Sequence, residues 1–418
     1  MDVQVAESRL REDIEANAEF GAVESEVGRG RTVLTGTKAD RQARERLVEQ
    51  LEAVGMEVRV DRVGNIAGRW TPARADPDAA PIAAGSHLDS VPRGGIFDGP
   101  LGTYAALEAV RAMQDAGAEP ERPIEVVSFT EEEGTSFSGL LGSAVAAGAL
   151  PVEEALALTN GNGTTLEEAL SEIGFQGEGT LDPSSWDAWL ELHIEQDTRL
   201  EREGVPIGVV TTITGISHGT ATVEGEANHA GATPMGERQD ALAAAAEVIL
   251  DVEAAANEIV ETESETAVGT VGKLNVTPNA TNVVPGGVEL GIDVRDIREE
   301  SIERIHDAIR ESLDRVADER DVETAYEESV GVPPVPMSDR LREEVHAAGD
   351  RTGIETIDLH SGAAHDTMHV ATVTDAALLF APSRDGISHN PREWTDWEDC
   401  AAATQVMTDA IVALAGGN

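Results

Sequence analysis

The stretch PIAAGSHLDSVPRGGIFDGPLGTYAALEAVRAMQDAG, residues 81–117, decides the fold of this 418-residue chain. Its first residues, PIAAGS, predict a short buried strand, and its last, LGTYAALEAVRAMQDAG, predict a helix. Between them stand His87, Asp89 and Asp98, together with glycines that let the backbone turn sharply. Strands that alternate with helices are typical of an α/β sheet, in which chemistry collects at the carboxyl ends of the strands.

Acidic residues dominate the composition. The chain has 79 Asp and Glu against 30 Lys and Arg, which gives a net charge of −49, and the acids are spread along its length. Such a charge is typical of adaptation to molar salt, where screening removes self-repulsion, so we predict a halophilic protein. An acidic partner-binding surface is the alternative. Nucleic acid is not expected as a partner, because its phosphates would be repelled.

Other bulk features concern the compartment. The N-terminal residues MDVQVAESRLRED lack the apolar core of a signal peptide, and no apolar stretch approaches the ~20 residues of a membrane span. Cys400 is the only cysteine, so an internal disulfide and a thiolate metal cluster are excluded. We predict a cytoplasmic protein that does not bind membranes, with Cys400 in its core.

The pattern along the chain predicts a catalytic domain interrupted by an insertion. IEVVSFT (124–130) and WLELHIE (189–195) predict further buried strands of the first part, residues 1–212. Residues 213–329 follow the order β-α-β-β-α-β, a ferredoxin-like unit. Residues 330–418 return to the first domain. We therefore expect a mixed sheet sandwiched by helices, with an inserted α+β domain.

Histidines and carboxylates follow the predicted strands, as a hydrolytic two-metal centre requires. His87 and Asp98 can supply two ligands, and Asp89 can hold the imidazole of His87 in one tautomer. Glu131, Glu132 and Glu133 repel one another unless cations are near, which favours a metal ligand and a general base among them. The residues alone do not say which glutamate does which, and a glycine-rich turn or a solvated acidic turn remains an alternative for each segment.

Eight motifs in order make the chain resemble a known family. They are GSHLDSVPRGGIFDGPLG, SFTEEEGTSF, LELHIEQ, NHAGATPMGERQDAL, NATNVVPG, DVRD, SGAAHD and FAPSRDGISHNPREWT. Together they are similar to the hydantoinase/carbamoylase family of amidases, within the two-metal aminoacylase–carboxypeptidase superfamily of zinc-exopeptidase-like fold. That family includes N-carbamoyl-L-amino-acid hydrolases, allantoate amidohydrolases and β-ureidopropionases. The resemblance extends from about residue 5 to about residue 412.

The resemblance implies roles for particular residues. It implies two divalent ions per subunit, zinc, manganese or cobalt, of which one is bound by His87 and His193, the other by Glu133 and His389, and both by Asp98. Glu132 would be the general base. His229 would stabilise the oxyanion from the partner subunit of a homodimer. The residues expected to contact the substrate are Gln196, Asn282, Arg295 and Ala363.

The expected reaction is hydrolysis of a ureido C–N bond to an amine, carbon dioxide and ammonia. A peptidase or N-acyl-amino-acid deacylase of the same superfamily is the nearest alternative, and a catalytically silent binding protein is another. Ala364 in SGAAHD, the sequence GATPM, and Asp197 after Gln196 depart from the common family pattern. These departures remove no expected ligand, but they affect the prediction of substrate specificity.

Overall fold

The computed structural model describes residues 3–416, which form two compact units. Unit 1 comprises Met1–Thr211 and Pro336–Asn418, and unit 2 comprises Thr212–Val335. Among the described residues, no helix is long and apolar enough to cross a membrane.

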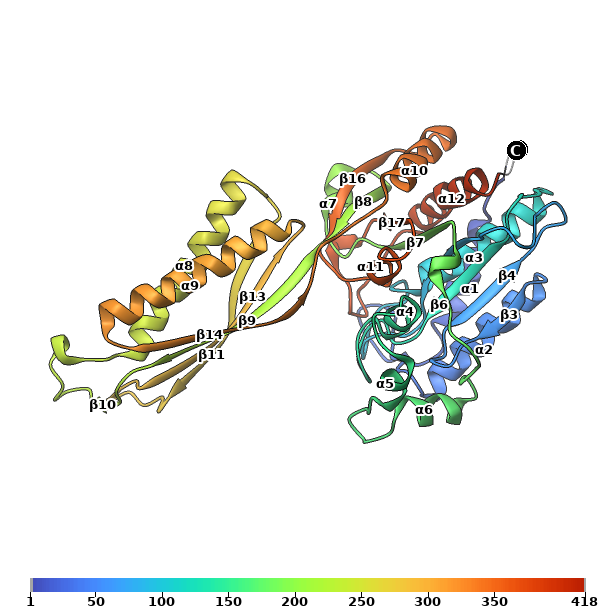
Figure 1. Ribbon diagram of the computed structural model, residues 1–418. Helices are drawn as coiled ribbons and strands as arrows, with labels where there is room; N and C mark the ends of the chain where they lie inside the picture. The colour runs from blue at the N-terminus through green and yellow to red at the C-terminus, as the bar shows by residue number, and fades with distance from the viewer. Residues whose placement is uncertain (1–2, 417–418) are drawn as a thin grey trace. The chain divides into compact units, whose positions relative to one another are not determined.

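Unit 1 is built on a mixed sheet of nine strands (Figure 1). The strands run in the order β15-β8-β17-β7-β5-β6-β4-β3, with β16 paired to β8. β5 is parallel to β6 and β7, and β7 is parallel to β17, whereas β4 is antiparallel to β3 and β6, and β8 is antiparallel to β17. The strand bounds are β3 Glu57–Val60, β4 Ile66–Trp70, β5 Ile82–His87, β6 Ile124–Phe129, β7 Ala188–Ile194, β8 Ile207–Ile213, β15 Val335–Pro336, β16 Thr356–Ser361 and β17 Ala376–Ala381, and a separate pair is formed by β1 Ala22–Val23 and β2 Gly30–Arg31.

Helices cover both faces of this sheet, because its central strands are apolar on both sides. On β6, Val126 belongs to the core cluster that contains α3 and α12, while Val127 belongs to the cluster that contains α11. Continuous apolar runs of this kind are typical of strands buried on both faces. The predicted mixed sheet sandwiched by helices is confirmed. The helices of unit 1 are α1 Glu7–Asn17, α2 Lys38–Ala53, α3 Pro100–Asp115, α4 Leu141–Ala146, α5 Val152–Ala157, α6 Leu166–Ile173, α7 Arg199–Glu203, α10 Asp339–Thr352, α11 Thr367–Val370 and α12 Trp397–Leu414, with 3₁₀ helices at Pro183–Ser185 and Arg384–Gly386.

The segment that follows β5 determines where α3 begins. Gly99 has φ = +81° and precedes Pro100, the first residue of α3. A positive φ favours glycine, and proline suits the first helical position because its missing N–H would have no partner there. Asp98 is thereby held just before the helix, close to the end of β5. Cys400 is fully buried in α12, as predicted.

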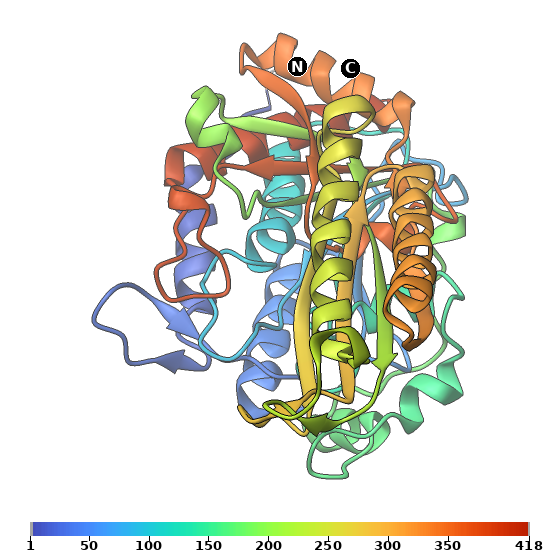
Figure 2. The same ribbon diagram turned by 90° about the vertical axis from the view of Figure 1, so that its left-hand side faces the viewer.

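Unit 2 is a four-stranded antiparallel sheet with two helices on one face. The strand order is β11-β13-β9-β14, and Figure 2 shows α8 and α9 side by side over the sheet. This order and the β-α-β-β-α-β sequence of the long elements are those of a ferredoxin-like unit. The bounds are β9 Gly215–Glu224, β10 Asn228–His229, α8 Ala241–Thr262, β11 Val268–Thr277, β12 Val283–Val284, β13 Gly287–Asp296, α9 Glu299–Arg320 and β14 Glu323–Val332, with a 3₁₀ helix at Met235–Glu237.

Candidate active site

The predicted ligands of unit 1 meet at the carboxyl ends of its central strands. His87 is the last residue of β5, and His193 is the penultimate residue of the parallel strand β7. Glu131 to Glu133 follow the end of β6, which is parallel to β5 on its other side. Because the carboxyl ends of parallel strands point the same way, these side chains are brought together although the chain separates them by up to 106 residues.

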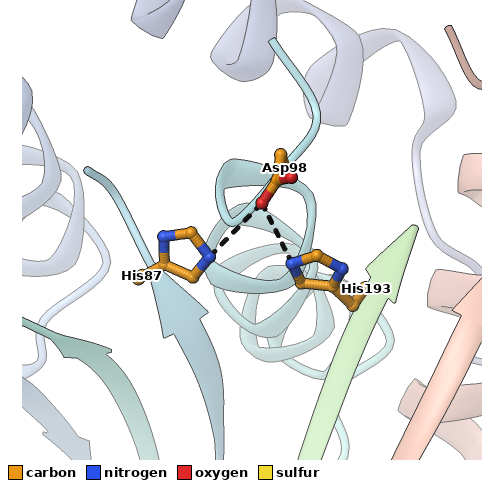
Figure 3. A group of neighbouring side chains, drawn as sticks. All are labelled: His87, Asp98 and His193. Carbon is orange, nitrogen blue, oxygen red and sulfur yellow. Dashed lines mark ion pairs between the residues drawn. The ribbon is translucent and has the colours of Figure 1, made fainter. Parts of the chain in front are cut away.

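The first group of candidate ligands consists of His87, His193 and Asp98 (Figure 3). The Nε2 atoms of His87 and His193 lie 3.5 and 3.2 Å from the same oxygen of Asp98, Oδ1. The Nδ1 of His193 lies 3.0 Å from the carbonyl oxygen of Ile194, so this nitrogen donates and leaves the Nε2 lone pair directed at Asp98. Among residues 3–416, neither Nε2 atom has a hydrogen-bond partner, although both are buried.

The second group consists of Asp98, Glu133 and His389. The Nε2 of His389 lies 3.4 Å from Oδ2 of Asp98 and 3.3 Å from Oε2 of Glu133. Asp98 therefore directs one oxygen to each group, which is the arrangement expected of a carboxylate that bridges two cations. His389 has φ = +55°, a conformation uncommon for a residue other than glycine, and such residues cluster at functional sites.

The three consecutive glutamates have different surroundings. Glu133 faces His389, and Oε2 of Glu132 lies 3.8 Å from Nε2 of His87. The carboxylate of Glu131 contacts neither His87 nor His389. It accepts the N–H groups of Ser136 and Phe137, at 2.5 and 2.8 Å. Glu131 therefore stabilises the turn that follows it, and only its two neighbours face the predicted ligands.

Burial and charge shift the pKa values of these groups strongly. Burial raises the pKa of Glu132 well above its ordinary value, although His87 opposes the shift. Burial and the charge of Asp98 raise the pKa of Glu133 to about 7. The hydrogen bond with Asp98 raises the pKa of His389 to about 9. Carboxylates so close together are stable only with protons or cations among them, and the buried Nε2 lone pairs favour cations.

Polar side chains around the ligands hold them in place. Oδ1 and Oδ2 of Asp89 accept the N–H groups of Glu132 and Glu133, and Oδ1 also lies 3.4 Å from Nδ1 of His87. Gln196 donates its Nε2 to Oδ2 of Asp98 at 3.0 Å, and Ser388 donates its hydroxyl to the same oxygen at 2.8 Å. Asp89 therefore connects the ligand His87 to the segment that carries Glu132 and Glu133.

Several residues of this region had no predicted role. His365 is buried, its Nε2 lies 3.1 Å from Oγ of Ser361, and its ring stacks edge-on against His193. Ser388 and Glu393 lie near the predicted ligand His389 in the motif GISHNPREWT. That position in the sequence could have indicated that they belong to the site. Arg31, from a short strand far from every motif, gave no signal.

Gln196 and Ala363 line a cavity of about 320 Å³ in unit 1. Asp197, one of the departures from the family pattern, lines the same cavity, but its Oδ1 accepts the N–H of Thr198 at 2.6 Å. Gln196 has φ = +60°, which turns its side chain toward Asp98 and Ser388. Gln196 thus contacts the candidate ligand Asp98 and also lines the cavity, together with Ala363.

His229, Asn282 and Arg295 belong to unit 2. The Nδ1 of His229 accepts the N–H groups of Gly231 and Ala232, at 3.0 and 3.1 Å, so its Nε2 carries the hydrogen. The carbonyl oxygen of Asn282 accepts the N–H of Ala230, which places Asn282 beside His229.

Arg295 is not beside them. His229 and Asn282 follow the strand ends that meet at Gly287, the first residue of β13, and Arg295 is the penultimate residue of that strand. At the rise of a β-strand, eight residues span about 27 Å. Within unit 2 the structure therefore brings His229 and Asn282 together and leaves Arg295 at the other end of the sheet. Both its Nε and its Nη2 donate to Asp293.

Comparison with known proteins assigns the chain to a family. Residues 83–413 match peptidase family M20/M25/M40. The chain is 39% identical over 404 residues to an N-carbamoyl-L-amino acid amidohydrolase of Geobacillus stearothermophilus, covering 96% of this chain and 97% of that protein. It is 32% identical to an allantoate amidohydrolase of Bacillus subtilis, covering 96% of each.

A solved structure agrees with these relatives. The crystal structure of a hydantoinase/carbamoylase family amidase from Burkholderia multivorans superposes with a TM-score of 0.90 at 36% identity, covering 99% of this chain and 98% of the other. The M20 family is metal-dependent, and the two groups of ligands described above are candidate metal-binding groups. The chain therefore belongs to peptidase family M20/M25/M40 and is a hydantoinase/carbamoylase family amidase, a hydrolase that acts on non-peptide C–N bonds.

Proposed function

We propose that the protein is a binuclear metal-dependent amidohydrolase that cleaves the ureido C–N bond of an N-carbamoyl-L-amino acid, or of allantoate or β-ureidopropionate. The observation that carries the proposal is the position of Asp98, whose two oxygens face two separate histidine-containing groups. The names of the relatives, N-carbamoyl-L-amino acid amidohydrolase and allantoate amidohydrolase, support a ureido substrate.

The residues present fit two divalent cations. His87 and His193 would hold one, Glu133 and His389 the other, and Asp98 both. Imidazole nitrogens and carboxylate oxygens suit zinc, manganese and cobalt alike. When bound, such ions polarise a substrate carbonyl and lower the pKa of water toward ~7. The unpartnered Nε2 atoms of the two buried histidines, noted above among residues 3–416, support this assignment.

Glu132 would serve as the general base. Its carboxylate is nearly buried and faces His87 without taking part in either group of ligands. It would accept a proton from the attacking water and then deliver this proton to the leaving nitrogen. Burial raises its pKa, and a base whose conjugate acid has a pKa nearer neutrality can both accept and return a proton. The products would be the amine, carbon dioxide and ammonia.

His229 would stabilise the developing oxyanion. Because its Nδ1 accepts two backbone N–H groups, its Nε2–H is available as a donor, and its imidazole is exposed on unit 2. A donor of this kind is typically worth ~3–4 kcal/mol in the transition state. Asn282, beside it, would contact the substrate from the same side, and Gln196 and Ala363 from the cavity in unit 1.

We further propose that the enzyme is a homodimer in which unit 2 is the dimerisation and lid domain. Arg295 would hold the substrate carboxylate through the guanidinium atoms that Asp293 leaves open. A small ureido substrate does not span the ~27 Å of β13 that separate Arg295 from Gly287, the strand end that His229 and Asn282 follow. Arg295 and His229 can contact one substrate only if they come from two subunits, and the family resemblance implies that His229 comes from the partner.

The edge strand β11 of unit 2 is a suitable surface for this contact. Val268 and Leu274 on this strand are 46% and 45% exposed, and Leu250 on α8 is 62% exposed. An edge strand with exposed apolar side chains is a template for pairing with a second chain. Light scattering in high salt should give twice the mass of one chain, and a monomer that is fully active would contradict the dimer.

One comparison of rates tests the function. The purified protein, in high salt and with zinc, manganese or cobalt added separately, is assayed with an N-carbamoyl-L-amino acid, allantoate, β-ureidopropionate, an N-acyl amino acid and a dipeptide. The proposal expects release of ammonia from at least one of the first three substrates, and none after chelation. Turnover of the acyl amino acid or the dipeptide alone would instead make the protein a deacylase or a peptidase.

A further inference from the structure

The segment that carries Asp98 is rich in glycine. We call residues 88–99, which join β5 to α3, the aspartate loop. It contains Gly94, Gly95 and Gly99, and glycine loses more conformational freedom on folding than any other residue. Since Asp98 faces both groups of ligands, a shift of this loop would displace both at once. Its conformation must therefore be fixed from outside.

One side of the loop is held by Arg31. This arginine is fully buried, and its own N–H donates to the carbonyl of Gly94. Its guanidinium donates only to backbone carbonyls among the contacts within residues 3–416: Nε to Gly95 at 3.2 Å, Nη1 to Leu88 at 3.0 Å, and Nη2 to Asp89 and Asp98 at 3.2 and 3.3 Å. A single planar group thus gathers carbonyls from both ends of the aspartate loop.

The other side of the loop is held by Glu393. This carboxylate is 2% exposed, and its Oε1 accepts the N–H groups of Phe97 and Asp98, at 2.9 and 3.1 Å. Its Oε2 lies 3.1 Å from the hydroxyl of Ser388, which in turn lies 2.8 Å from Oδ2 of Asp98. A Cβ atom on Gly95 would lie 2.0 Å from this carboxylate, so glycine is needed there for Glu393 to reach the loop.

Burying two charged side chains such as those of Arg31 and Glu393 is costly. Replacing buried charged pairs by apolar residues of similar size often leaves the stability of a protein unchanged. Neither Arg31 nor Glu393 belongs to the two groups of candidate ligands. Arg31 binds carbonyl groups of the aspartate loop, and Glu393 binds N–H groups of the same loop. The two side chains therefore restrain different backbone groups. Such partners behind the ligands typically tune metal affinity.

We propose that Arg31 and Glu393 are positioning residues that clamp the aspartate loop from its two sides and thereby set the place of Asp98 between the two groups of ligands. The proposal rests on the metal centre proposed above. It does not concern the substrate. Loss of either clamp leaves the ligands themselves in the chain but lets Asp98 move, so metal affinity falls before the fold is lost.

The test compares two conservative variants with two matched controls. In Arg31→Lys, one ammonium group cannot reach carbonyls as widely spaced as those bound by the guanidinium. In Glu393→Gln, one oxygen still accepts the N–H groups, but the amide presents donors to Ser388. Arg111→Lys and Glu125→Gln are the controls: Arg111 is 7% exposed and bonded to Gln50, and Glu125 is 1% exposed and paired with Arg59 and Arg69.

The readouts are metal affinity, from competition of the metal-free protein with a chromophoric chelator for Co²⁺, the absorption spectrum of the bound Co²⁺, and Tm. Arg31→Lys and Glu393→Gln should each weaken Co²⁺ binding by ~10–100-fold and alter the spectrum. The two control variants should lower Tm without changing the affinity for Co²⁺ or the absorption spectrum of the bound Co²⁺. The glutamate variant keeps the test decisive if the arginine variant does not fold.

Two negative outcomes are distinguishable. If the unaltered protein binds no Co²⁺, the proposed metal centre fails, and the clamp fails with it. If the unaltered protein binds Co²⁺ and both clamp variants bind it with the same affinity and the same spectrum, then Arg31 and Glu393 serve only stability, and this inference alone is overturned.

Discussion

Three adjacent glutamates show how much a single residue's surroundings decide. Glu131, Glu132 and Glu133 have the same side chain, and their pattern alone does not say which is ligand and which is base, although the family resemblance implies Glu133 and Glu132. Glu131 has φ = +57°, and its carboxylate accepts backbone N–H groups of the next turn. The turn that this creates directs Glu132 toward His87 and Glu133 toward His389.

The base assignment predicts a specific loss. In Glu132→Gln, the amide keeps the volume but cannot accept a proton, so turnover should fall by ~10²–10⁴-fold while the metal content is unchanged. Single-turnover kinetics and metal analysis of the same sample measure both. Glu131→Gln is the matched control, because its amide oxygen can still accept the N–H groups of Ser136 and Phe137. If Glu132→Gln retains near-normal turnover, the base lies elsewhere.

Some residues of the site could be predicted from the sequence, and others could not. His87, Asp98, His193 and His389 could be singled out because they follow predicted strands or stand in motifs. Their roles as ligands remain a prediction, which their convergence supports. Arg31 could not be found in this way, because its partners are backbone carbonyls of a distant loop, and backbone groups carry no sequence signal.

At the scale of elements, the close contact of α3 with the end of the sheet brings Asp98 to the ligands. Gly102 lies in the first turn of α3, where a Cβ atom would be 2.2 Å from the carbonyl oxygen of Leu192 and 2.8 Å from Cβ of Ser86. The helix can therefore approach β5 and β7 only because this residue has no side chain.

The close approach predicts the effect of adding one methyl group. Gly102→Ala should lower the free energy of unfolding by about 1–3 kcal/mol, the usual cost of overpacking a core, because the clash is with backbone that cannot move aside. Urea unfolding in constant high salt measures it. Gly161→Ala is the control, since nothing lies within 4 Å of a Cβ at that position. Equal stability of the two variants would show that α3 can shift at no cost.

Strands differed in how well their sequences predicted them. β5, β6 and β7 are buried along their whole length, and all three were expected. β8 and β16 were not assigned, although IGVVTTI of β8 is largely apolar, whereas TIDLHS of β16 mixes apolar with polar residues. β16 is only partly buried, so its pattern depends on neighbours that the sequence does not reveal.

At the scale of the molecule, the charge of −49 leads to a prediction about salt. In dilute buffer the carboxylates repel one another in the folded state more than in the expanded unfolded chain, whereas molar salt screens this repulsion. Tm should therefore rise between about 0.1 M and about 3 M KCl. Calorimetry in both buffers measures it. The same Tm in both would mean that the acidic surface serves another purpose, such as binding a partner.

The shared site predicts recovery of activity in mixed dimers. His229→Ala and Glu132→Gln should each be inactive, but a dimer with one copy of each has one site in which both residues are intact. Random mixing of equal amounts should restore about a quarter of the unaltered activity, because half of the dimers are mixed and each has one working site. Mixed dimers that are verified by mass and remain inactive would place His229 in its own subunit's site.

The sequence by itself determined the fold class, the insertion of an α+β unit, and the set of side chains from which a metal site could be built. Periodicity, glycines and motifs are local properties, and they suffice for these conclusions. The tertiary structure decided which glutamate faces which histidine, that Asp98 lies between two groups, and that Arg31 and Glu393 hold its loop. These facts depend on parallel strands and a tightly packed helix bringing distant residues within a few ångströms of one another, and no local pattern specifies such distances.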